Sequence, residues 1–148
     1  MQMTNGEEPA LTGQDADICS RIQRERRAGY IRCGVVEGRM SVTEVARAFG
    51  LADDGAIYRS IGSVEANKIA THVLCADLAY SLEIMSVSEA ADLWRQFMSL
   101  FEGKDVVFVS NAGSECDSWM PATPATFDMG VLVIGTTKAG CLWVEDED

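Results

Sequence analysis

The clearest candidate for chemistry is the end of the chain, where four carboxylates follow one another in the segment "GCLWVEDED". Carboxylates are ligands that hard divalent cations prefer. Successive residues of a strand point to opposite faces, so such a run does not converge on one metal ion by itself. We therefore predict no metal site, and we expect these charges to attract a basic protein partner, because opposite charge accelerates association. The four residues are Glu145, Asp146, Glu147 and Asp148.

A second group of candidate residues lies in the long connection at positions 110–128, which Pro121 and Pro124 stiffen. Connections of this length in compact domains are usually functional or lack fixed structure. Aromatic side chains ringed by polar ones are typical of the energetically important centre of a protein interface. The alternative is that Trp119 and Phe127 fold back and cover the sheet. We predict that the same partner-binding surface also includes Glu115, Asp117, Trp119, Phe127 and Asp128.

Catalytic groups are not indicated. His72 is the only histidine, and it stands beside apolar residues without an indicated partner. The sequence has no G-x-S-x-G motif, no glycine-rich phosphate loop and no metal-ligand cluster. The five cysteines include no C-x-x-C pair, which favours reduced, buried thiols over disulfides or zinc. We predict that the protein is not an enzyme and that it uses no cofactor.

The charge of the chain narrows the class of partner. It has 12 basic and 23 acidic side chains, and its net charge is -11. Residues 60–148 hold four basic and fourteen acidic side chains, whereas residues 1–59 hold eight and nine. Such a charge repels phosphate backbones and anionic membranes, so we predict neither nucleic acid nor membrane as a partner. No signal-peptide pattern and no apolar run of about 18 residues is present, so we expect a cytoplasmic protein.

The elements that must position these groups begin with helices. Ser41 and Ser86 each precede a Glu by three residues, and this capping box satisfies free backbone groups at a helix start. Between the two boxes, apolar residues recur every three or four positions, which predicts a longer, buried helix. Helices are expected near 15–28, 42–49, 64–85 and 87–102.

Residues rich in Val, Ile and aromatic side chains predict strands elsewhere. The expected strands lie near 30–37, 106–110, 130–135 and 140–145. Together these elements predict one α+β domain over residues 15–148, after a flexible N-terminal segment at 1–14. Its helices should pack on one face of a small antiparallel sheet, with a C-terminal meander of about three strands.

Residues 41–62, "SVTEVARAFGLADDGAIYRSIG", suggest a different function. Ala46 and a turn residue, Gly50, four positions later resemble part of a helix-turn-helix DNA-binding unit. Asp53 and Asp54 would then lie where the recognition helix approaches phosphates, which repel carboxylates. A helix-turn-helix regulator is therefore an alternative function, and the net charge opposes it.

In overall character, a small acidic protein with one enriched contact surface resembles bacterial toxin-neutralising immunity proteins, a class that commonly binds basic nuclease toxins. The resemblance implies that the partner is a basic, possibly nuclease, toxin domain and that the function is inhibition. A general adaptor role is a further alternative, since charge indicates partners and not fold. The sequence leaves the partner's identity and the oligomeric state open.

Overall fold

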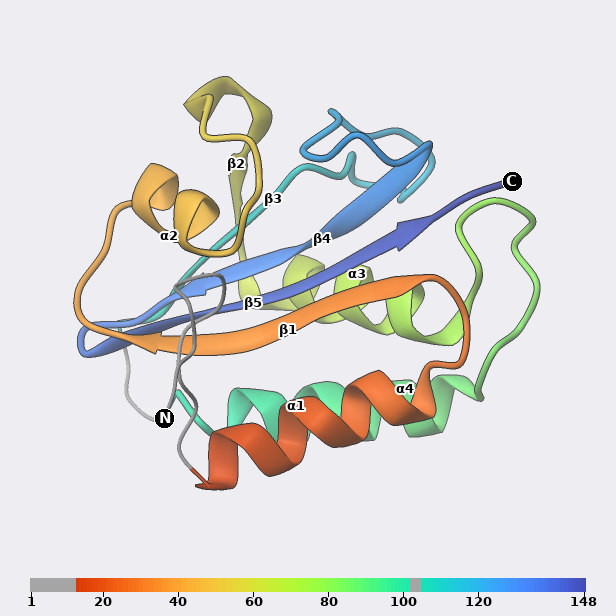
Figure 1. Cartoon of the computed structure of the whole chain (residues 1–148), viewed down its shortest axis with the longest axis horizontal. Helices are drawn as coiled ribbons and strands as arrows, with labels where there is room; N and C mark the ends of the chain where they lie inside the picture. The colour runs from red at the N-terminus through yellow and green to blue at the C-terminus, as the bar shows by residue number, and fades with distance from the viewer. Residues whose placement is uncertain (1–12, 102–104) are drawn as a thin grey trace, which may run out of the picture.

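A computed structural model describes residues 13–101 and 105–148, and it confirms the predicted α+β architecture (Figure 1). Four α-helices and one 3-10 turn accompany five strands in this part of the chain. No helix among these residues combines the length and apolarity needed to cross a membrane. The helical elements are α1 (Gly13–Glu25), α2 (Val42–Ala48), η1 (Gly55–Ile57), α3 (Ser63–Cys75) and α4 (Val87–Met98).

The strands form a single antiparallel sheet in the order β1-β5-β4-β3-β2. The predicted meander is confirmed as β3 (Val107–Ser110), β4 (Phe127–Ile134) and β5 (Lys138–Asp146). The strand expected at 30–37 is also confirmed: β1 (Tyr30–Glu37) extends the sheet beside β5. A short strand, β2 (Arg59–Ile61), pairs with β3 and is an addition to the predicted sheet.

Both faces of the sheet are covered, whereas the sequence predicted helices on one face only. Helices α1, α3 and α4 pack on one face, where Ile22 and Phe97 are fully buried. The short helix α2 packs on the other face, where Val45 shares a core with Trp143. In Figure 1, α1 and α4 run beneath the sheet and α2 stands above it. This double coverage explains why β4 and β5 are almost continuously apolar, since strands buried on both faces do not alternate.

The longest predicted helix is wrong in its second half, because α3 ends at Cys75. The Asp77 side chain accepts hydrogen bonds from the backbone N–H groups of Ala79 and Tyr80, so it offers the backbone an alternative to the helix. The Asp77 N–H then bonds to the carbonyl of Leu82, and residues 76–85 double back as a loop. Both capping boxes are confirmed.

The other predicted boundaries differ less. Helix α1 starts at Gly13, two residues early, and ends at Glu25. Helix α4 ends at Met98, before the predicted 102. The N-terminal segment predicted to be flexible lies outside the described residues, except for its last two positions.

The geometry needed for a helix-turn-helix unit is absent from the segment proposed for it, all of which the structure describes. Helix α2 forms. In place of the second, recognition helix the chain forms η1 and then strand β2, which pairs with β3. Arg59 pairs with Glu65 and donates to the carbonyl of Ala112 at 2.6 Å. Arg47 pairs with Asp53 at 3.1 Å. Both arginines therefore contact the protein itself.

Candidate functional site

Most residues predicted to bind a partner lie at one end of the sheet. There, β4 begins and β5 ends, between the loop at 76–85 and the loop at 111–126 (Figure 1). Two buried polar groups set the positions of these loops.

The first group is an ion pair at the end of β5. The carboxylate of Asp146 lies 3.0 Å from the guanidinium of Arg26, and both side chains are buried. Arg26 also donates to the carbonyls of Val73 at 2.7 Å and Ala76 at 3.0 Å, at the C-terminal end of α3. Asp146 accepts from the backbone N–H of Leu78 at 2.9 Å. One ion pair therefore joins α1, α3, β5 and the loop at 76–85.

The second group lies beneath the other loop. Asp128 on β4 is fully buried, and its carboxylate accepts from the indole N–H of Trp143 at 3.0 Å. It also accepts from the side-chain amide of Asn111 at 3.0 Å and the backbone N–H of Ala122 at 3.1 Å. Asn111 donates in turn to the carbonyl of Met120 at 2.8 Å. Both ends of the loop at 111–126 are thus held by one carboxylate and one amide.

These contacts correct the predicted acidic rim. Asp128 and Asp146 face the interior, because each satisfies buried N–H donors that would otherwise lack partners. Glu145 is half-buried and pairs with Arg32 at 2.8 Å. The predicted acids that remain exposed are Glu115, Asp117, Glu147 and Asp148.

A cavity of about 320 Å³ opens between the two loops, and we call it the aromatic cavity. Trp119 and Phe127 form part of its wall, with ring centroids 5.4 Å apart and planes inclined by 41°. Both rings are half-buried, so each is partly covered by the protein and partly exposed. The cavity is lined by His72, Leu78, Ser81, Glu115, Cys116, Asp117, Trp119, Phe127 and Met129.

Three of the four terminal acidic residues, Glu145, Asp146 and Glu147, line a different cavity. This acidic cavity, of about 460 Å³, is lined by Ala28, Gly29, Tyr30, Asp77, Glu145, Asp146 and Glu147. Asp77 borders the acidic cavity, and its neighbour Leu78 borders the aromatic one. The single predicted surface is therefore divided into two hollows by the segment that Asp146 holds.

The aromatic cavity also contains residues that sequence reasoning missed. His72 at the end of α3 and Ser81 in the loop at 76–85 line the same cavity as Cys116, which is distant from both in the chain. Ser81 and Cys116 both have backbone φ near +60°, a left-handed conformation that costs about 1–2 kcal/mol outside glycine. The Asp77 turn that precedes Ser81 is a signal that the sequence carries, because Asp commonly bonds to the backbone two residues on.

His72 and Cys116 line the same cavity, and a histidine beside a cysteine is the pair that nucleophilic catalysis uses. Burial, with Arg26 and Lys68 nearby, lowers the pKa of His72. Burial raises the pKa of the Cys116 thiol despite Lys68. An active cysteine needs the opposite arrangement, a thiolate beside a protonated imidazole. These shifts favour two neutral side chains and do not favour a nucleophile.

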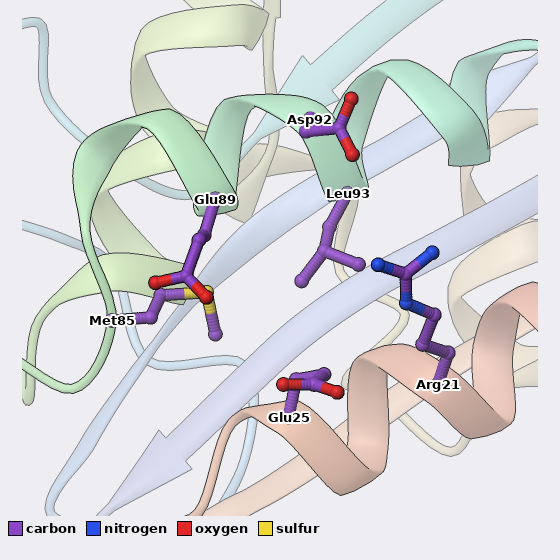
Figure 2. A pocket seen from close by; sticks show the side chains of 6 residues that line it. All are labelled: Arg21, Glu25, Met85, Glu89, Asp92 and Leu93. Carbon is purple, nitrogen blue, oxygen red and sulfur yellow. The ribbon is translucent and has the colours of Figure 1, made fainter.

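A third hollow lies between α1 and α4 (Figure 2). It holds about 50 Å³. Arg21 and Glu25 come from α1, and Glu89, Asp92 and Leu93 come from α4, as Figure 2 shows. Ligand sites usually have several hundred Å³, so this hollow fits water better than a ligand. No group of three or more His, Cys, Asp or Glu among residues 13–101 and 105–148 is arranged to hold a metal ion.

No protein-family model, curated protein or solved structure matches this chain.

Proposed function

We propose that this protein binds a basic protein partner through the aromatic cavity and the exposed acids around it. The observation that carries the proposal is that the loop at 111–126 and the start of β4 bring Trp119 and Phe127 to one cavity together with Glu115 and Asp117. Half-buried aromatic side chains next to exposed charge are typical of energetically important positions in interfaces. The net charge of -11 supports a basic partner, because complementary charge raises the association rate.

Within this class, we propose an inhibitor of the immunity type, whose partner is a basic toxin domain. Such a protein has to block a partner quickly and tightly. The acidic surface favours rapid encounter. The two buried polar groups hold both loops in place before binding, and a preorganised surface loses less conformational entropy when it binds.

We also propose that the protein acts in the cytoplasm. Five free cysteines are present, three of them buried. Free thiols persist in a reducing compartment, whereas extracellular proteins tend to oxidise them. This supports a partner that is met inside the cell.

Affinity capture from cells of the source organism tests the binding proposal. The intact chain should retain a basic protein, Trp119→Ala should lose it, and Val87→Ala should keep it. Val87 is a matched control because it is an apolar residue on α4, it is 64% exposed, and it lines neither cavity. Capture that Trp119→Ala leaves unchanged would contradict the proposed surface.

A growth assay tests the inhibitory role. Production of the captured partner alone should arrest growth, and production of the intact chain with it should restore growth. A partner that is harmless when produced alone would contradict immunity and favour an adaptor.

A further inference from the structure

The three tryptophans of this protein differ in the use of their indole N–H groups. Trp94 donates to the side chain of Asn67 at 2.7 Å, and Trp143 donates to Asp128 at 3.0 Å. Trp119 has no such acceptor among the described residues, although its ring lies on the wall of a cavity. Trp and Tyr usually find a partner for the N–H or O–H group when they are buried. Among the described residues, Trp119 thus borders the cavity with an indole N–H that has no acceptor.

Two carboxylates at the same cavity differ in a similar way. Glu115 lies 3.4 Å from the ammonium group of Lys68, and both side chains are exposed. Exposed pairs of this kind contribute little free energy and exchange partners easily. Asp117 is exposed and has no ion-pair or hydrogen-bond partner within residues 13–101 and 105–148. The cavity thus offers at least one carboxylate that a cation can use.

The remaining polar groups of the cavity do not oppose a cation. Burial lowers the pKa of His72, so its imidazole is uncharged near neutral pH. Burial likewise keeps the Cys116 thiol protonated by raising its pKa. Lys68 is the cation paired with Glu115 at the rim, and the carboxylate of Asp117 remains in excess.

We infer that the aromatic cavity receives an arginine side chain of the basic partner. The guanidinium stacks against Trp119 and pairs with Asp117. This inference rests on the proposed function and names what the partner inserts. Arginine fits better than lysine because its planar group stacks on aromatic faces and is more weakly hydrated. An apolar side chain would fit less well, because it would meet the polar groups of His72, Ser81 and Cys116 without satisfying them.

The cavity's size agrees with one side chain. Its volume of about 320 Å³ lies at the lower end of the range for small-molecule sites. Its walls come from loops that Asp128 and Asp146 hold in place. A preformed site of this kind loses little conformational entropy on binding, so even a single amino-acid derivative should bind measurably.

The test is an NMR titration of the ¹⁵N-labelled full chain with N-acetyl-arginine amide. The indole N–H signal of Trp119 should shift and saturate, whereas those of Trp94 and Trp143 should not move. N-acetyl-citrulline amide is the matched control, since it has nearly the same shape without the charge. N-acetyl-lysine amide and N-acetyl-leucine amide test the other occupants. Asp117→Asn should weaken arginine binding roughly two- to fivefold. Glu37→Gln, at an exposed acid that ends β1 and lines neither cavity, should leave it unchanged.

The outcomes separate this inference from the proposed function. Saturable arginine binding at Trp119, with weaker binding of citrulline, lysine and leucine, supports the inference. Three results would overturn the inference: equal shifts of the Trp119 signal with the citrulline derivative, stronger binding of the leucine or lysine derivative, or no saturation with the arginine derivative. Binding kinetics with the captured partner test the proposed function separately. If Trp119→Ala slows or prevents formation of that complex but the arginine derivative does not bind, the proposed function stands and the arginine site does not. If the arginine derivative binds but Trp119→Ala leaves capture unchanged, the site stands and the proposed function does not.

Discussion

Two pairs of carboxylates at the same end of the molecule have opposite roles. Asp128 and Asp146 are almost fully buried, and each accepts several hydrogen bonds, at least one of them from the loop beside it. Glu115 and Asp117 are exposed on one of those loops. Glu115 has an exposed ion pair with Lys68, and Asp117 has no ion-pair or hydrogen-bond partner in the described part of the chain. The first pair positions the cavities, and the second pair gives one of them its charge. The number of donors around a carboxylate therefore decides whether it is fixed in the interior or left exposed.

The largest effect is expected when the buried ion pair is broken. Asp146→Asn leaves Arg26 charged and buried without a counterion, which costs about 3–5 kcal/mol of unfolding free energy. Asp148→Asn, two residues later and exposed, should change the unfolding free energy by less than about 0.5 kcal/mol. Urea titration of both variants provides the comparison. Equal stability of the two variants would show that Asp146 does not hold this end together.

The next largest effect concerns binding. Trp119→Ala should accelerate dissociation of the captured partner by an amount worth about 2 kcal/mol or more, because it removes the main aromatic contact. Trp119→Phe keeps an aromatic face and should lose less. Surface plasmon resonance gives the rate constants, and thermal melting checks that each variant is folded. If Trp119→Ala unfolds the protein, the ring serves the core instead of the interface.

A smaller effect is expected from the loop conformation that shapes the aromatic cavity. Ser81→Gly should raise the unfolding free energy by about 0.5–1 kcal/mol, since glycine adopts positive φ without strain although it gains entropy when unfolded. Ser99→Gly is the matched control. Ser99 has φ -63°, so its replacement by glycine relieves no strain and should lower the unfolding free energy. Urea titration distinguishes the two signs. A loss in both variants would mean that Ser81 is not strained.

The pH dependence of stability should report on His72. Its pKa in the folded protein is below the ordinary value of 6.5, so between these two values the unfolded chain binds more protons. The stability that it contributes is present above pH 6.5 and is lost as the pH falls through the folded pKa. His72→Gln should therefore lose less stability than the natural protein between about pH 7.5 and about pH 5.5. Urea titrations of both proteins at these two pH values measure the change. Equal losses of unfolding free energy in His72→Gln and the natural protein would contradict the prediction.

The smallest effect on stability is expected from the exposed acids. Changing Glu115, Asp117, Glu147 and Asp148 to their amides should alter the unfolding free energy by no more than about 0.5 kcal/mol. Association with the captured partner should become slower and less dependent on salt, because exposed charges steer encounter and are screened by ions. Stopped-flow measurement at low and high salt tests this. An unchanged association rate would remove these acids from the interface.

The sequence by itself was sufficient for the local features. Capping boxes at Ser41 and Ser86 are formed by residues three positions apart, and both are present as predicted. The strands at 106–110, 130–135 and 140–145 and their meander order also follow from short-range patterns. The candidate residues Glu115, Asp117, Trp119 and Phe127 were predicted together because they share one long connection.

Only the tertiary structure decided the rest. Local spacing could not show that Asp146 meets Arg26, 120 positions away, or that residues 145–147 line a different cavity from Trp119. It also predicted helix across residues 76–85, where the Asp77 carboxylate and the bond from Leu78 to Asp146 favour a loop. A buried carboxylate destabilises the fold when it has no hydrogen-bond donors, and it stabilises the fold when several donors surround it. Which of the two applies depends on distant segments, and a stretch of sequence does not contain that information.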